Sequence, residues 1–169
     1  WHFFDANTGI GVGSAGQIIR TTDGGDSWTS ITSPTTQTLL GVHVQGNTAL
    51  AMGTVGDLLR STDAGLSWSL QTLDLFDLLG AWLNPDGLGL LVGKARVYRT
   101  ADMGAAWQPV QIGTWHTYLN KVSFGTEQIG ASAGWLTLGG LENGVVRTLD
   151  GGRHWSNVSA GAGEWLGVH

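Results

Sequence analysis

Aspartate and arginine recur in this sequence at a constant spacing, and their side chains have the clearest capacity for chemistry. Two facing carboxylates can act as the acid and base of a glycoside hydrolase, and a guanidinium group binds a carboxylate through two parallel hydrogen bonds. An arginine precedes an aspartate by three residues in four places: Arg20 and Asp23, Arg60 and Asp63, Arg99 and Asp102, and Arg147 and Asp150. A glycine and a tryptophan follow each aspartate by two and five residues: Gly25 and Trp28, Gly65 and Trp68, Gly104 and Trp107, and Gly152 and Trp155.

The constant spacing favours a structural role for the four aspartates. A short carboxylate at the end of a strand can accept hydrogen bonds from backbone amides two or more residues on, which closes a turn. The glycine permits the positive φ that such a turn needs, and the tryptophan that starts the next strand can bury roughly 150–250 Å². We therefore expect the aspartates to stabilise turns, and we predict no catalytic residue among them.

Two interpretations of the four arginines remain open. They occupy the same position in each repeat, so a circular arrangement of repeats would place them in an arc. Each guanidinium group can pair with carbonyls or carboxylates of the neighbouring repeat. Alternatively, the arc can bind an acidic segment of a partner, because guanidinium groups suit carboxylates.

The composition excludes several classes of protein. With 169 residues and 41% hydrophobic residues, the chain has enough apolar material for one folded domain and is not disordered. The formal net charge of −5 argues against binding to nucleic acid. No apolar stretch reaches the roughly 20 residues needed to span a membrane. The absence of cysteine excludes disulfides and thiolate-bound zinc.

The elements that carry the repeated residues are predicted to be short strands. The arginines lie 40, 39 and 48 residues apart, and each repeat contains short apolar pieces bounded by Gly, Asn, Asp or Pro. Four strands in about 40 residues is the size of one propeller blade, and no amphipathic helical stretch is present. We predict an all-β fold, a single β-propeller domain over residues 1–169 with four blades at approximately 1–39, 40–78, 79–118 and 119–169.

The two ends of the chain suggest how the propeller closes. The segment Leu166-Gly-Val-His169 repeats Leu40-Gly-Val-His43, so the last residues are equivalent to the first strand of the first repeat. A late strand that completes the first blade would remove exposed sheet edges. We predict a closed ring of four blades. The alternative is that the chain is part of a larger propeller.

The repeated motif Ser/Thr-x-Asp-x-Gly-x-x-Trp resembles the Asp-box (BNR repeat) of sialidases, sortilin-type receptors, xyloglucan-cleaving hydrolases and photosystem II assembly factors. The stretch from His2 to Trp28 is most similar to the photosystem II assembly and stability factors and their bacterial relatives. That resemblance implies a non-enzymatic scaffold that binds a protein partner in an extracytoplasmic or lumenal setting. Two alternatives stay open: a carbohydrate-active enzyme or lectin, and a structural subunit that associates with copies of itself through open repeat edges.

Few residues of the sequence could be the catalytic groups of a sialidase or another glycosidase. A sialidase needs a tyrosine nucleophile, a glutamate and three arginines for its substrate, and a glycosidase needs paired carboxylates. Tyr98 adjoins Arg99 in the repeat and is predicted to pack. The remaining candidates are Tyr118, Glu127, Glu142, Glu164, Asp74, Asp77 and Asp86. We interpret the three aspartates among them as solvated loop residues.

Two regions depart from the repeat and are candidate contact surfaces. Trp115, His116 and Tyr118 form an aromatic cluster that either covers the core or contacts a protein or sugar. The seven additional residues of the last repeat lie in Gln128–Asn143, predicted as a longer hairpin. The five histidines show no metal-ligand spacing, so we predict no metal site and no cofactor.

Overall fold

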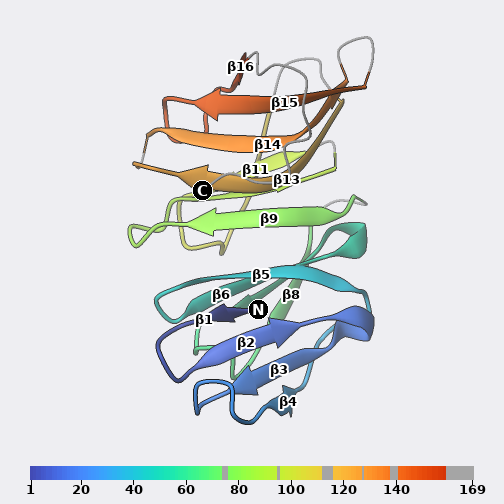
Figure 1. The fold of residues 1–169 in the computed structure, drawn as a ribbon, viewed down its shortest axis with the longest axis vertical. Coiled ribbons are helices and arrows are strands. Elements are labelled where there is room, and N and C mark those ends of the chain that lie inside the picture. The colour runs from blue at the N-terminus through green and yellow to red at the C-terminus, as the bar shows by residue number, and fades with distance from the viewer. Residues whose placement is uncertain (74–75, 95, 112–115, 127, 138–140, 159–169) are drawn as a thin grey trace. The chain divides into compact units, whose positions relative to one another are not determined.

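A computed structural model describes residues 1–169 apart from 74–75, 95, 112–115, 127, 138–140 and 159–169. The described residues form four four-stranded antiparallel sheets, here called blades 1 to 4, and two 3₁₀ turns. Within each blade, neighbours in the sheet are also neighbours in the chain (Figure 1). The predicted all-β class with four repeated blades is confirmed.

The strands of the first two blades cover residues 2–72. Blade 1 contains β1 (His2–Phe3), β2 (Gly9–Val12), β3 (Ile18–Thr21) and β4 (Thr29–Ile31). Blade 2 contains β5 (Leu39–Gln45), β6 (Thr48–Gly53), β7 (Asp57–Ser61) and β8 (Ser69–Thr72). The 3₁₀ turns η1 (Ser14–Gly16) and η2 (Thr54–Gly56) connect the second and third strands of these blades.

The strands of the last two blades cover residues 78–158. Blade 3 contains β9 (Leu78–Leu83), β10 (Gly89–Gly93), β11 (Val97–Thr100) and β12 (Gln108–Val110). Blade 4 contains β13 (His116–Phe124), β14 (Gly130–Thr137), β15 (Leu141–Thr148) and β16 (Ser156–Val158). The register of β14 against β15 continues to Thr137 opposite Leu141, so the additional residues of the last repeat lengthen this hairpin.

The chain divides into two compact units, Trp1–Leu78 and Leu79–His169. The segment Leu166–His169, on which the predicted ring closure depends, lies outside the described residues. Closure of the ring and the single domain over 1–169 therefore stay predictions.

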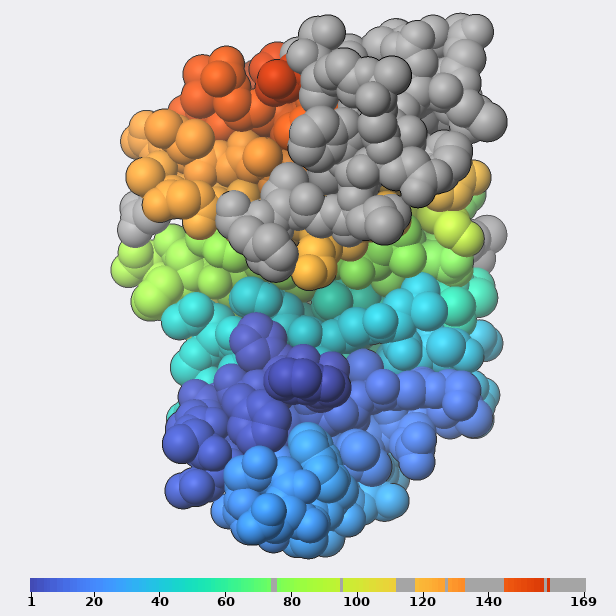
Figure 2. Space-filling view, viewed as in Figure 1, coloured from blue at the N-terminus to red at the C-terminus, as the bar shows by residue number. Residues whose placement is uncertain are grey.

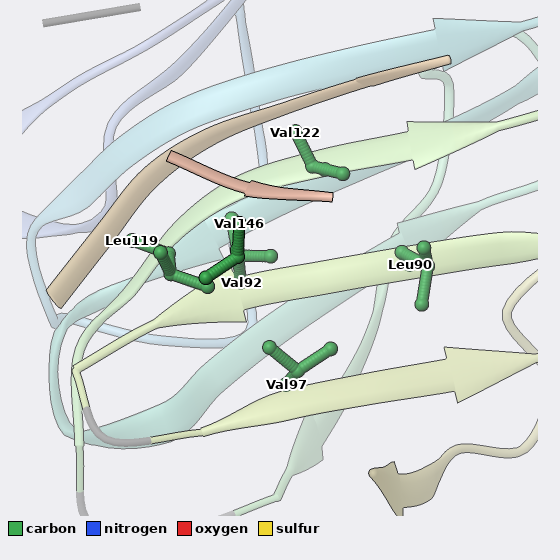
Figure 3. Close-up of a cluster of buried hydrophobic side chains, with 6 residues drawn as sticks. All are labelled: Leu90, Val92, Val97, Leu119, Val122 and Val146. Carbon is green, nitrogen blue, oxygen red and sulfur yellow. The ribbon is translucent and has the colours of Figure 1, made fainter. Parts of the chain in front are cut away.

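Each unit has its own apolar core, built mainly from the inner strands of its blades. Every residue of β6 and β10 is buried, which matches their uninterrupted runs of small and apolar residues. In the first unit the buried cluster comprises Ile10, Ile18, Leu39, Ala51 and Leu59. In the second unit it comprises Leu90, Val92, Val97, Leu119, Val122 and Val146 (Figure 3). Both clusters combine residues of two successive blades, so each unit is held together by blade-to-blade packing.

The glycine of an Asp-box turn allows this turn to lie close to the preceding blade. Gly65, in the turn of blade 2, has φ +81°, and a Cβ there would stand 2.3 Å from Cδ1 of Ile10 in β2. Gly152, in blade 4, has φ +82°, and its Cβ would stand 2.6 Å from Cδ1 of Leu90 in β10. The two units thus repeat one junction, in which a glycine packs against the second strand of the blade before it.

Substitution of Gly65 by alanine tests this close approach. We expect Gly65→Ala to lower the free energy of unfolding by about 2–4 kcal/mol, because it adds steric overlap to the cost of a positive φ. Gly46→Ala is the matched control, since Gly46 has φ +56° but a Cβ added there would meet no atom within 4 Å. The control should lose only the conformational contribution, about 1–2 kcal/mol. Equal losses for the two variants in urea unfolding would contradict the packing of this turn on β2.

Candidate functional site

The Asp-box turn of blade 1 is closed by two side chains that act together. The Oγ1 of Thr21 donates to Oδ1 of Asp23 at 2.7 Å and accepts from the amide of Gly25 at 3.0 Å. The same Oδ1 accepts from the amide of Ser27 at 2.9 Å, and the Ser27 hydroxyl donates to Oδ2 at 2.5 Å. Finally, the indole of Trp28 donates to the carbonyl of Gly25 at 3.1 Å. Both aspartate oxygens are therefore occupied within the turn itself.

The other three turns repeat the bonds of the hydroxyl, of Oδ1 and of the indole. The hydroxyl two residues before the aspartate is at most 2% exposed in every blade, at Thr21, Ser61, Thr100 and Thr148. It accepts from the glycine amide at 2.9–3.1 Å in all four turns. The amide four residues after the aspartate donates to Oδ1 at 2.9 Å each time, from Ser27, Ser67, Ala106 and His154. The indole donates to the glycine carbonyl at 3.1–3.2 Å.

The buried hydroxyl is the part of the turn whose role sequence reasoning missed. The amide of the glycine was expected among the donors to the aspartate, but this amide donates to the hydroxyl, and the carboxylate accepts the amide four residues on. The signal was present as the Ser/Thr that opens the motif. A hydroxyl can donate once and also accept, so it alone can link the carboxylate to the glycine amide.

Hydrogen bonds also hold three of the box carboxylates in their ionised form. The hydroxyl and amide of Ser67 lower the pKa of Asp63 to about 2. Partial burial acts to raise the pKa of Asp150, but the amide and ring of His154 and the Thr148 hydroxyl outweigh it and bring the value to about 2. The Ser27 hydroxyl, with Thr21, holds the pKa of Asp23 far below its usual range. A general acid needs a raised pKa, so these carboxylates are unsuited to that role.

The arginines of the first and third blades connect successive blades. Nε of Arg20 donates to the carbonyl of Ala64 at 2.8 Å, and Nε of Arg99 donates to the carbonyl of Gly151 at 3.1 Å. Both carbonyls belong to the Asp-box turn of the next blade. The structure thus shows the first interpretation for these two arginines. Arg60 is half-buried on β7 and Arg147 is exposed on β15. A partner-binding arc of all four stays a prediction.

The box tryptophans are only partly buried. Trp68 packs against the core of the first unit and Trp155 against that of the second. Trp28 is 37% exposed and borders a pocket of about 190 Å³ with Trp1, Gly11, Val12, Gln17 and Ile19. Figure 2 shows the first residues of the chain, in the darkest blue, on the face in view.

The predicted aromatic cluster is described only in part. Trp115 lies outside the described residues, and so does the side chain of His116, which opens β13. Tyr118 is 45% exposed and pairs with Trp135 in the sheet. A contact surface formed by these three residues therefore stays a prediction.

The remaining catalytic candidates do not form a site among the described side chains. Tyr98 is buried at 6% exposure, and Asp77 accepts the amide of Val55 at 3.2 Å. Glu127, Glu164 and Asp74 lie outside the described residues, as does the side chain of Glu142. Asp86 is exposed in the turn between β9 and β10. Apart from the undescribed positions, no group of three or more His, Asp and Glu residues could hold a metal ion.

The sequence did not predict one buried carboxylate, that of Asp57. Asp57 is 7% exposed and accepts from the hydroxyl of Thr35 at 2.5 Å and from that of Thr72 at 3.3 Å. It stands where the other blades have Gln17, Arg96 and Gly144, so the repeat pattern gives no signal for it. Its two hydroxyl partners tie the segment before β5 to β7 and β8, which indicates a structural role.

Removal of one buried hydroxyl should weaken the fold strongly. We expect Ser61→Ala to lower the free energy of unfolding by about 2–3 kcal/mol, because the Gly65 amide and the Asp63 carboxylate lose a buried partner. The matched control is Ser69→Ala, which removes an exposed hydroxyl bonded to the Arg60 carbonyl at 3.1 Å and should change stability by less than about 0.5 kcal/mol. Similar losses in chemical denaturation would contradict the role of the buried hydroxyl.

The depressed pKa of Asp63 predicts a specific loss of stability in acid. The folded value, about 2, lies below the ordinary 3.8, so the stabilisation is complete above about pH 4 and disappears as the pH falls through 2. The variant Asp63→Asn should therefore lose less stability than the wild type between pH 4 and pH 2. The measurement is urea unfolding across this range, with Asp86→Asn as the control. Identical pH profiles for Asp63→Asn and the wild type would overturn the assignment.

Comparison with known proteins supplies the wider context. Among solved structures, YCF48 bound to a D1 peptide matches with a TM-score of 0.59 and 19% identity over 92% of this chain and 78% of that chain. YCF48 from Cyanidioschyzon merolae matches with a TM-score of 0.69 and 20% identity over 95% of this chain and 55% of that chain. An ancestral GH74 enzyme matches with a TM-score of 0.76 and 16% identity, but this chain covers only 23% of it. At these identities the likeness shows the fold, and the four sheets are β-propeller blades.

Three further findings concern sequence and membranes. No match was found among the curated proteins. In the portion of the chain that the structure describes, there is no helix of sufficient length and apolar character to cross a bilayer. The model of the family described as photosynthesis system II assembly factor YCF48 matches residues 1–108, which is more than half of the 169 residues. The chain, with its four Asp-box blades, belongs to this YCF48 family.

Proposed function

We propose that this chain is a non-enzymatic binding module that recognises a segment of a protein partner and acts as an assembly or scaffolding factor. Membership in the YCF48 family supports an assembly role, and the solved structure of YCF48 with a D1 peptide shows that a protein of this kind binds peptide. By the same likeness we propose an extracytoplasmic location.

The observation that carries the proposal is how the box carboxylates are used. In the turns of blades 1, 2 and 4, both oxygens of the aspartate are hydrogen-bonded within the turn. The same fold occurs in hydrolases. In this chain, however, these carboxylates are ionised and stabilise the backbone of their own turns. A glycosidase needs one carboxyl group with a raised pKa, facing a second across the substrate. The described side chains offer no such pair, which favours binding over catalysis.

A peptide-binding assay with a hydrolysis arm tests the proposal. Overlapping synthetic peptides that cover the D1 sequence are titrated into the protein by fluorescence anisotropy, and scrambled peptides of the same composition are the control. We expect one contiguous group of peptides to bind saturably and more tightly than its scrambled forms, and no reducing ends to be released from xyloglucan. Binding that does not distinguish native from scrambled peptides would overturn the proposal. Hydrolysis of xyloglucan that is abolished by Asp86→Asn would do so in favour of the carbohydrate-active alternative.

A further inference from the structure

A polar pocket lies at the junction of blades 3 and 4, within the second unit. Its volume is about 320 Å³, and its lining includes Arg99 of β11, Gln128 before β14, and the blade 4 turn residues Leu149, Asp150 and Arg153. Leu88 and the backbone of Gly151 complete it. A space of this size admits one charged group with an adjoining side chain. It is too small for a folded surface.

In the contacts of the described residues, each guanidinium group of the pocket donates from one nitrogen atom. Nε of Arg99 donates to the Gly151 carbonyl at 3.1 Å, and Nη1 of Arg153 donates to the Asp150 carbonyl at 3.2 Å. These contacts hold both side chains in place. A guanidinium group has five N–H donors, so one carbonyl occupies only a part of each.

The carboxylate in the pocket, that of Asp150, is hydrogen-bonded within its own turn. Oδ1 of Asp150 accepts from the Thr148 hydroxyl at 2.9 Å and from the amide of His154 at 2.9 Å, and Oδ2 contacts Nδ1 of His154 at 2.5 Å. Among the described residues that line the pocket, two guanidinium groups accompany one carboxylate, an excess of one positive charge. Burial, and then the positive charge of Arg153, lower the pKa of Arg99, which Asp150 opposes only in part.

The position of the second cation differs in residue type among the four repeats. Residue 153 stands three after the box aspartate, and the equivalent positions hold Asp26, Leu66 and Ala105. The equivalent junction of the first unit has the same arginine-to-carbonyl bond, from Arg20 to Ala64, but an exposed leucine at Leu66. That junction closes without a cation at this position. Arg153 therefore occupies a variable position of the repeat, where it adds a second guanidinium group beside that of Arg99.

We propose that this pocket binds a carboxylate of a protein partner between the guanidinium groups of Arg99 and Arg153. The inference rests on the proposed function and names the chemistry that the partner presents. Guanidinium groups bind carboxylates through paired, charge-assisted hydrogen bonds. The side chain of Leu149 is exposed. It offers an apolar surface to an aliphatic side chain that adjoins this carboxylate in the partner. A single excess positive charge suits a monoanion, whereas a phosphate dianion would face the carboxylate of Asp150.

Short peptides in an NMR titration of the full chain test the pocket. The probes are acetyl-Gly-Glu-Leu-amide, with a side-chain carboxylate, and acetyl-Gly-Gln-Leu with a free C-terminus. The neutral control is acetyl-Gly-Gln-Leu-amide. We expect at least one charged probe to shift the amide signals of residues 149–153 saturably, and the neutral peptide to leave them unchanged. The probe that binds tells whether a side chain or a chain end is preferred. Equal shifts from neutral and charged peptides, or tighter binding of inorganic phosphate than of both probes, would overturn the proposal.

Two variants separate recognition from general electrostatics. Arg153→Leu installs the residue type found at the equivalent position of blade 2, and it should weaken binding of the charged probe about ten-fold with an unchanged melting temperature. Lys121→Leu removes an exposed positive charge elsewhere in blade 4 and should leave binding within about two-fold. Equal weakening by both variants would contradict a specific pocket.

If D1 peptides bind Arg153→Leu as tightly as the wild type, the pocket assignment fails while the proposed function stands. If carboxylate probes bind and no partner peptide does, the proposed function fails instead.

Discussion

The fold depends on one buried hydroxyl in each blade, the Ser or Thr two residues before the box aspartate. At Ser61 it is 2% exposed, and it donates to the carboxylate while it accepts the amide of Gly65. This contact holds the glycine at a positive φ with its face against Ile10 of the preceding blade. It also presents the carbonyl of Ala64 to the arginine of that blade. Turn geometry and blade-to-blade packing are thus set by the same few atoms, and the same holds at the junction of blades 3 and 4.

The hydrogen bonds within the turn also limit what its carboxylate can do. A carboxylate that accepts several hydrogen bonds in its own turn has a depressed pKa and no free oxygen to present, so the most conspicuous acidic residues of the sequence are structural. In the described contacts, each arginine that bridges blades uses one N–H for a carbonyl, and a guanidinium group has five. The proposed carboxylate pocket depends on a position that varies among the repeats. At the blade 3–4 junction this position holds Arg153, next to an arginine that the repeat already positions.

Much of the fold, and a smaller share of the site, could be predicted from residue spacing. The four motifs predicted the strands, the turns and the glycine conformation, because each depends on contacts within a few residues. The bond from Arg99 to the Gly151 carbonyl joins residues 52 apart, so spacing left two interpretations of this arginine open. Sequence reasoning did not single out Arg153, because Arg99 and Leu88, which line the same pocket, come from the preceding blade. Asp57 was missed because its partners Thr35 and Thr72 flank it at a distance in the chain.

The sequence by itself determined that this protein is made of four similar β-sheets, each with a turn that depends on an aspartate, a glycine and a tryptophan. It could do so because the side-chain hydrogen bonds that close such a turn span at most four residues, and a local pattern encodes a local structure. Only the tertiary structure decided what lies against each turn: Ile10 against Gly65, Leu90 against Gly152, and two arginines beside one pocket. Side chains brought together by packing of one blade on the next have no fixed separation along the chain, so no spacing rule can encode their contact.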